Sequence, residues 1–282
     1  MPSPELASVD GLISDTAEAR IPPADDGLLR GDGVFEVIRL YAGRPFALTE
    51  HLDRIERSAA AIELAVEREP LAAEIAALLE RFGSHDGQLR LVITRGGRRL
   101  AFTENLPPRG ETITLASVRY APTIILTGVK SLSYAANMQA TRIAQGRGAG
   151  EAVLVRPDGI VLEAPTSSLF WVSGDGRLRT PAIGTGILES ITRARIVREL
   201  DVAEGEWPLG DLLAAEEAFL ASTTREVQPV SAVDGNELPS VPGARTDEAA
   251  EAFAAVLERE LPDTSGSTSG AGAGSASTST RA

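Results

Sequence analysis

The chain has 282 residues, 43% of them hydrophobic, with a formal net charge of -13 and no cysteine. That length and hydrophobic content suffice for two domains, each with its own core. The negative charge disfavours nucleic acid and anionic lipid as partners, and the lack of cysteine excludes disulfides, thiolate metal sites and cysteine nucleophiles.

Further exclusions narrow the class of protein. No apolar run approaches the roughly 18 residues that a membrane-spanning helix needs. The first residues lack the basic and apolar regions of a secretion signal, so a cytoplasmic protein is expected. Only His51 and His85 are histidines, too few and too far apart for a histidine-built metal site or a Ser-His-Asp triad. An enzyme of this composition must rely on lysine, carboxylates or a cofactor.

The first part of the chain alternates predicted strands with predicted helices. Hydrophobic alternation and turn residues predict strands at 34–41, 46–48, 88–94 and 113–118, and helical periodicity predicts helices at 50–64 and 70–82. Thr49 is the expected N-cap of the first helix. This order predicts a small N-terminal α+β domain over residues 1–118.

A connection over residues 119–126, which contains Pro122, leads into a second predicted domain over residues 127–263. Helices are expected at 134–145, 191–200 and 246–260, and strands at 151–155, 160–163, 169–172, 218–222 and 227–233. Residues 264–282 are rich in Ser, Thr, Gly and Ala, which predicts a disordered tail.

Lys130 is the only lysine in a chain whose Lys and Arg together number 27. Arginine can replace lysine wherever a permanent charge suffices, but a guanidinium stays protonated and cannot act as an amine nucleophile. An amine that must form an imine with a carbonyl group therefore has to be lysine. The alternative is a surface lysine without function, and composition alone leaves both interpretations open.

Two segments of the second domain have the character of a phosphate site. The loop 185–190 enters a predicted helix whose first amides, those of Ile191 and Thr192, are free donors at the positive end of the helix dipole. The run 222–224 ends a predicted strand with three hydroxyl groups. A capped helix with nothing bound explains the first segment equally well. The glycines at 146, 148 and 150 follow a helix rather than a strand, so they indicate a helix end and not a dinucleotide-binding loop.

Six motifs occur in order between residues 27 and 236: GDGVFE (31–36), EHLDRI (50–55), KSLSY (130–134), LEAPTSSLF (162–170), GILESITR (186–193) and STTREVQPV (222–230). Together they resemble the class IV aminotransferases, which are pyridoxal 5'-phosphate enzymes of fold type IV. The resemblance implies an α/β (α+β) fold with a small N-terminal α+β domain and a larger, β-barrel-like C-terminal domain. It also implies a homodimer, with the active site between the domains.

The resemblance assigns roles residue by residue. Lys130 is similar to the Schiff-base lysine, which also moves a proton, and Glu163 to the partner of the pyridine nitrogen, where a carboxylate favours the protonated ring. The remaining cofactor-binding residues implied are Arg54, Ile191, Thr192 and Thr223 around the phosphate, Tyr134 at the ring hydroxyl and Leu188 under the ring. Ser133 and Ser168 depart from the family, which usually has asparagine at both positions.

The implied reaction moves an amino group from an amino donor to a 2-oxo acid. Phe35, Val37 and Arg39 alternate along one strand as in the D-amino-acid enzymes, so a D-amino acid is the expected donor, with (R)-amines as further substrates. We expect Arg39 with Arg98 or Arg99 to bind the substrate carboxylate, and Thr224 to lie in the same site; solvent-facing loop arginines are the alternative for 98 and 99.

Other functions stay open at this point. A branched-chain L-amino-acid aminotransferase is the first alternative, although this chain has Val37 where the branched-chain enzymes usually have glycine. An aminodeoxychorismate lyase is the second, but the lyases usually carry a threonine there, and valine has no proton to give. A non-catalytic binding protein does not require a lysine at position 130, and an oxidoreductase lacks a dinucleotide-binding motif.

Overall fold

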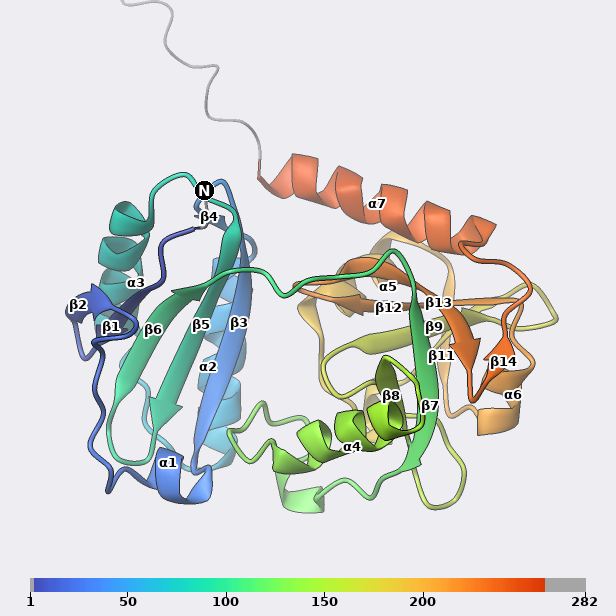
Figure 1. Ribbon diagram of the computed structural model, residues 1–282, viewed down its shortest axis with the longest axis horizontal. Helices are drawn as coiled ribbons and strands as arrows, with labels where there is room; N and C mark the ends of the chain where they lie inside the picture. The colour runs from blue at the N-terminus through green and yellow to red at the C-terminus, as the bar shows by residue number, and fades with distance from the viewer. Residues whose placement is uncertain (1–2, 262–282) are drawn as a thin grey trace, which may run out of the picture.

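The computed structural model describes residues 3–261, in which two β-sheets lie side by side (Figure 1). The first sheet has the order β2 (Leu12–Asp15), β1 (Leu6–Val9), β6 (Arg99–Glu104), β5 (Gly87–Thr94), β3 (Gly33–Tyr41) and β4 (Arg44–Pro45). Its helices are α1 (Asp26–Arg30), α2 (Leu48–Ala61) and α3 (Arg68–Phe82). All of its strand pairs are antiparallel.

One face of the first sheet forms a hydrophobic core with α2 and α3. Val34, Ile38 and Leu40 alternate along β3 and meet Ile55 of α2 and Leu78 of α3 in one cluster. The opposite face of β3, with Phe35 and Val37, is therefore turned away from the helices, as the two-residue period of a strand requires. That second face is free to line a site.

The second sheet is a curled half-barrel of mixed direction. Its order is β11 (Val202–Gly205), β10 (Leu178–Pro181), β9 (Ser168–Val172), β12 (Glu217–Ser222), β13 (Glu226–Val233), β7 (Ile113–Arg119) and β8 (Glu151–Val155), with β14 (Asn236–Glu237) paired to β13. Around it lie α4 (Ala135–Gly146), α5 (Ile191–Glu199), α6 (Leu209–Leu213) and α7 (Ala244–Glu260), and the 3-10 turns η1 (Ile124–Leu126) and η2 (Ile183–Thr185). No helix within residues 3–261 is both long and apolar enough to cross a membrane.

The mixed α+β organisation expected from the sequence is confirmed, with local corrections. The strand expected at 113–118 in the N-terminal domain is β7, which pairs in parallel with β8 and β13 of the second sheet. Helix α2 begins at Leu48 after Ala47, whose backbone is left-handed, so Thr49 is not its N-cap. Strands β1, β2, β6, β10, β11 and β14 were not predicted, and the strand expected at 46–48 is β4 at Arg44–Pro45. The strand expected at 160–163 is absent apart from isolated bridges at Ile160 and Val161. The tail at 264–282 lies outside the described residues.

We expect Phe170→Ala to lower the free energy of unfolding by about 3–5 kcal/mol. The Phe170 ring is fully buried and stacks on Phe219, with ring centroids 4.8 Å apart, in the layer between the second sheet and α7. Truncation leaves a cavity that the stacked partner cannot fill. Urea unfolding measures the loss, with Leu12→Ala as the control because the Leu12 side chain is 79% exposed. A loss below about 1 kcal/mol would show that this layer repacks.

Candidate active site

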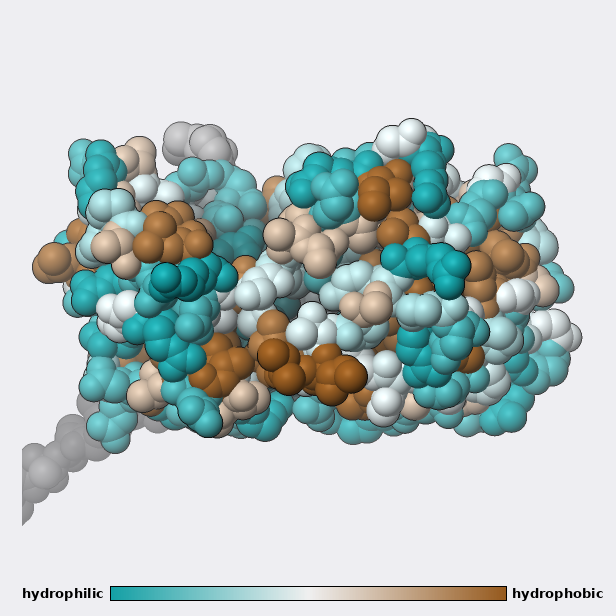
Figure 2. Space-filling model, turned by 90° about the horizontal axis from the view of Figure 1, so that it is seen from below, coloured by the Kyte–Doolittle hydropathy of each residue, from teal (hydrophilic) through white to brown (hydrophobic). Residues whose placement is uncertain are grey.

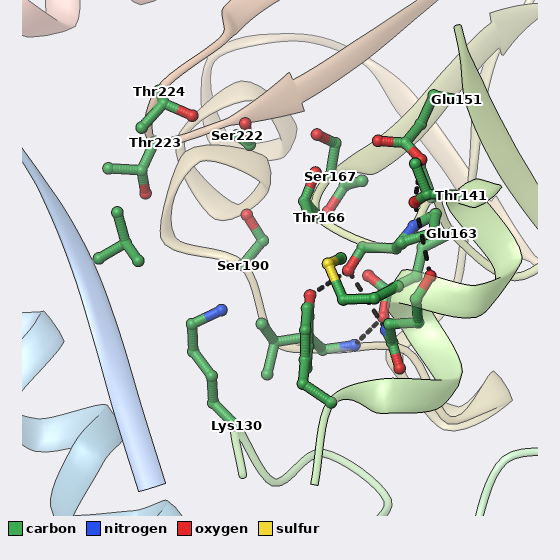
Figure 3. Close-up of a pocket in the computed structure, with 18 of the residues that line it drawn as sticks. Lys130, Thr141, Glu151, Glu163, Thr166, Ser167, Ser190, Ser222, Thr223 and Thr224 are labelled. Carbon is green, nitrogen blue, oxygen red and sulfur yellow. Dashed lines mark hydrogen bonds between the residues drawn. The ribbon is translucent and has the colours of Figure 1, made fainter. Parts of the chain in front are cut away.

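A cavity of about 1080 Å³ lies between the two sheets, next to the free face of β3. The first half of the chain contributes residues of β3, β5 and α2, and the second half contributes the segments 126–134, 162–168, 186–190 and 222–225. Figure 3 shows side chains from these segments converging on one space. The site thus depends on the way the two sheets are placed against each other.

Lys130 lies in the segment between η1 and α4 and is held by the first half of the molecule. Its backbone N–H donates to Ser58 Oγ of α2 (3.2 Å), and its carbonyl accepts from Phe35 N of β3 (3.0 Å). The Lys130 Nζ lies 4.4 Å from the centroid of the Phe35 ring. In Figure 3 the amine points into the cavity. The segment is therefore fixed at its backbone while its amine stays available.

The surroundings of Lys130 lower the pKa of its amine, so a larger fraction of the amine is neutral here than in water. Within residues 3–261 the amine has no hydrogen-bond or ion-pair partner. Burial lowers the pKa of Lys130 to about 8; the charge of Glu36 opposes this shift and the charge of Arg54 adds to it. An amine with such a pKa can exchange a proton near neutral pH, which the ordinary value of 10.5 does not allow.

Glu163 lies across the cavity from Lys130 (Figure 3), and both side chains are half-buried. Its carboxylate accepts a hydrogen bond from the backbone N–H of Leu188 (2.9 Å). Burial raises the pKa of Glu163 to about 7, although the Leu188 amide and the charge of Lys130 act in the opposite direction. A carboxyl with this pKa is stabilised as an anion by any cationic group placed in the cavity.

Tyr134 packs edge-on against Phe35, with ring centroids 5.3 Å apart, at the N-terminus of α4. Its hydroxyl donates to the carbonyl of Pro165. Burial and the nearby charge of Glu163 raise the pKa of Tyr134, so the phenol stays neutral. A neutral phenol at the cavity wall can donate or accept a hydrogen bond but carries no charge.

Arg54, Ser190, Thr223 and the first turn of α5 surround one end of the cavity. The Arg54 guanidinium donates from Nη1 to the carbonyl of Glu189 (2.9 Å), immediately before the helix. Ser190 is the N-cap and accepts from Arg193 N, so the amides of Ile191 and Thr192 are not used by the cap. A cationic side chain, free helix amides and hydroxyls are the groups that bind phosphate.

The predicted substrate residues fall into two groups. Phe35, Val37 and Thr224 line the cavity. The predicted arginines do not: Arg39 stacks over Tyr41 and pairs with Asp86, Arg98 pairs with Asp10 (2.5 Å), and Arg99 pairs with Glu67 and Glu74. Each of the three faces a carboxylate outside the cavity, so the arrangement does not support their binding of the substrate carboxylate, which stays a prediction.

Arg90 lines the cavity, unlike the three predicted arginines. It lies on β5 directly opposite Val37. Glu104 accepts from its Nε (2.9 Å) and more weakly from Nη2 (3.5 Å), which leaves Nη1 unpaired. The alternation of Gln88, Arg90 and Val92 in the predicted strand was the available signal, since a lone arginine in an apolar strand indicates a lined cavity rather than a core.

These features together fit pyridoxal phosphate. The end with Arg54 and the α5 amides suits the phosphate, Glu163 suits a ring nitrogen that carries a proton, and Lys130 supplies an amine in the same cavity. Two further buried hydroxyls at the cavity wall, those of Ser167 and Ser168, lack a hydrogen-bond partner among the described residues and are available to a ligand. The two-sheet fold and the cavity between the sheets are those of a pyridoxal-phosphate enzyme.

The comparisons with known proteins identify the family. The family model for amino-transferase class IV matches residues 33–233. A putative branched-chain-amino-acid aminotransferase of Methanocaldococcus jannaschii is 33% identical over 252 residues, covering 80% of this chain and 87% of the relative. The D-alanine aminotransferase of Bacillus licheniformis is 32% identical over 265 residues, covering 84% and 92%. The fold IV transaminase CpuTA1 of Curtobacterium pusillum superposes with a TM-score of 0.77 at 28% identity, covering 89% of this chain and 99% of that one.

The chain belongs to the class IV aminotransferases. It has the two-sheet fold of type IV transaminases and, as a member of this family, is a pyridoxal-phosphate-dependent enzyme. The resemblance noted in the sequence is thereby confirmed. The two relatives act on different kinds of amino acid by their names, so family membership alone leaves the substrate open.

Proposed function

We propose that this aminotransferase moves the amino group of a D-amino acid to a 2-oxo acid, with Lys130 as its catalytic residue. The observation that carries the proposal is the only lysine of the chain, which lines the cavity with a free amine and with its pKa lowered to about 8. When bound, pyridoxal phosphate supplies the electron sink that stabilises a carbanion at the substrate Cα.

The residues around the cavity divide the remaining tasks. Lys130 takes a proton from the Cα of the amino donor and, in the second half of the reaction, gives one to the Cα of the acceptor. Both steps require an amine that gains and loses protons near neutral pH. Glu163 holds the positive charge at the ring nitrogen, and Tyr134 orients the ring edge. Arg54, Thr223 and the amides of Ile191 and Thr192 bind the phosphate, and Leu188 packs against the ring.

The substrate side of the cavity supports the proposed D-preference. Phe35 and Val37 line it from β3, as expected of the D-amino-acid enzymes, and Val37 offers no hydroxyl of the kind used by a lyase. The similarity to a D-alanine aminotransferase supports the same assignment. A branched-chain L-amino-acid aminotransferase is the second candidate, because the relative from M. jannaschii carries that name and the cavity wall is largely apolar at Phe35, Val37 and Val92.

The two candidates differ in a single-turnover experiment. The holoenzyme is mixed separately with D-alanine and with L-leucine, and the visible absorbance of the bound cofactor is followed together with the 2-oxo acid that is released. We expect the absorbance to change with D-alanine and to stay constant with L-leucine. A change with L-leucine alone would transfer the protein to the branched-chain group.

We expect Arg90→Gln to raise the KM for D-alanine about 10- to 100-fold, which is the effect of removing a hydrogen bond to a charged group. Arg90 lies opposite Val37 in the sheet, and its free Nη1 can bind the substrate carboxylate. A neutral (R)-amine has no carboxylate, so its KM is expected to change less than about twofold. Steady-state kinetics with both donors measure the difference.

Arg98→Gln is the matched control for Arg90→Gln. It removes an arginine that pairs with Asp10 outside the cavity, and we expect the KM for D-alanine to stay within about twofold. Equal losses with D-alanine and the amine in Arg90→Gln would contradict the role in carboxylate binding. A loss in Arg98→Gln alone would restore the hypothesis made from the sequence.

We further propose that the protein acts as a homodimer. Ile124 and Ile125 are 89% and 82% exposed, and Leu28 and Leu29 of α1 are 59% and 61% exposed. Figure 2 shows hydrophobic residues gathered where the two halves meet on the face seen from below. Since Leu126 and Thr127 line the cavity, a second subunit on this surface closes the site. Sedimentation velocity tests the dimer.

A further inference from the structure

Glu36 is a buried charge on the core face of β3. Its neighbours on that face are Val34 and Ile38, and its side chain is 0% exposed. The carboxylate accepts two hydrogen bonds from Arg54, from Nε to Oε1 (2.7 Å) and from Nη2 to Oε2 (2.7 Å), and a third from His51 Nδ1 (2.8 Å). A hydrophobic residue of similar size fits this position in the core better than a charge does.

Stability alone does not explain such a pair. Removing two charges from water costs free energy that their attraction recovers only in part, so a buried ion pair is weak evidence for stabilisation. The geometry points instead to orientation, because a two-pronged contact fixes both the plane and the direction of a guanidinium. With Nε and Nη2 held by Glu36 and Nη1 donating to the carbonyl of Glu189, the remaining N–H bonds of Arg54 are directed by its partners.

His51 completes the arrangement. Burial lowers the pKa of His51, so the ring is neutral and donates its Nδ1 proton to the carboxylate, which can only accept. The pKa of Glu36 is lowered to about 2, because Arg54 and His51 outweigh the effect of burial. The carboxylate is thus ionised throughout the physiological range and is held from two sides by residues of one helix, α2.

We propose that Glu36 is a positioning residue that aims Arg54 at the phosphate of the cofactor and offsets the charge of Arg54 beside Lys130. The inference rests on the proposed role of Arg54 as a phosphate ligand and is independent of which amino acid is the substrate. The charge of Glu36 raises the pKa of Lys130 and that of Arg54 lowers it, which supports the second part.

The test compares two forms of the cofactor on Glu36→Gln. Apoprotein is titrated with pyridoxal phosphate and with pyridoxal, which lacks the phosphate, and the two dissociation constants are measured by absorbance and fluorescence. We expect binding of pyridoxal phosphate to weaken about 10- to 100-fold while binding of pyridoxal changes less than about threefold. Damage to the fold weakens both ligands alike, so an equal loss with both ligands, or no loss with either, would overturn the proposal.

Arg54→Ala separates this inference from the assignment of Arg54. If Arg54→Ala leaves the preference for the phosphate form unchanged, the proposed phosphate site fails. If Arg54→Ala abolishes the preference and Glu36→Gln does not reduce it, only the inference about Glu36 fails. In the double variant we expect no further loss beyond Arg54→Ala, because Glu36 acts on the phosphate through Arg54.

Two further variants serve as controls, one for the loss of a carboxylate from any buried arginine and one for the loss of the charge at Glu36. Glu260→Gln removes a carboxylate from the similarly buried Arg195, which also pairs with Glu50 of α2, and we expect both dissociation constants to stay unchanged. Glu36→Asp keeps the charge but is one methylene too short for the two-pronged contact. Glu36→Asp is expected to fold even if Glu36→Gln does not. It is also expected to lose part of the preference for the phosphate form. A full wild-type preference in Glu36→Asp would show that orientation is not what Glu36 provides.

Discussion

Lys130→Ala is expected to lower the rate of amino transfer about 10⁴-fold or more, the largest effect of any single substitution in this protein. Among residues 3–261 only Lys130 places a free amine in the cavity, so no neighbouring side chain can take over the proton transfer. The rate of 2-oxo acid formation from the amino donor measures the loss. Because Arg54 and the α5 amides remain, we expect the variant to retain bound cofactor after dialysis.

Lys130→Arg is the informative companion. It preserves the positive charge, the length and the contact with the Phe35 ring, but a guanidinium does not give up its proton. We expect it to be as inactive as Lys130→Ala, and we expect a small primary amine added to the solution to restore part of the activity in Lys130→Ala only. Activity within about tenfold of wild type in either variant would show that another group moves the proton.

Glu163→Gln is expected to reduce turnover about 10- to 100-fold and, in the apoprotein, to increase stability. The folded protein holds the pKa of Glu163 at about 7, above its ordinary value of 4.5. Between these two values the folded state binds more protons than the unfolded state, so stability falls as pH rises through this window, and the loss is complete above it. Glutamine has no charge to bury, and the variant is expected to be more stable by about 2 kcal/mol at about pH 8.

Urea unfolding of the apoproteins at about pH 8 and about pH 4 tests the prediction, since the difference should vanish at the lower pH. Glu36→Gln provides the contrast. The pKa of Glu36 is lowered to about 2, so its charge stabilises the fold above pH 4.5, and that variant is expected to be less stable at about pH 8. A Glu163→Gln apoprotein that is less stable than wild type at both pH values would show that the Leu188 contact outweighs burial.

The sequence alone was sufficient to predict which residues in short motifs lie in the site. Lys130 is distinctive by composition, and Glu163, Arg54 and Thr223 lie in segments whose residue order is informative on its own. The structure brings Lys130, Glu163, Arg54, Thr223 and Tyr134 around one cavity. Their roles in catalysis stay predictions until the variants are measured.

Residues that are brought to the site by strand pairing could not be predicted from the sequence. Arg90 reaches the cavity because β5 pairs with β3 in a register that sets it opposite Val37, and a sequence does not display that register. Arg98 and Arg99 looked available because their loop is basic, but Asp10 and Glu74, remote in the chain, neutralise them. The strand Ile113–Arg119 was assigned to the wrong half because chain order does not reveal which sheet a strand joins.

Helix α2 bears on how the enzyme keeps its cofactor. From one face it reaches the other half of the molecule twice, since Arg54 binds the carbonyl of Glu189 and Ser58 binds the amide of Lys130. Both bonds end on segments that border the cofactor site. With Arg54 as the proposed phosphate ligand and Lys130 as the proposed catalytic residue, separation of the two halves is expected to break the phosphate contact and to displace the lysine in the same movement. Cofactor escape and domain opening become one event, and the holoenzyme is expected to resist proteolysis at the interdomain segments far longer than the apoprotein.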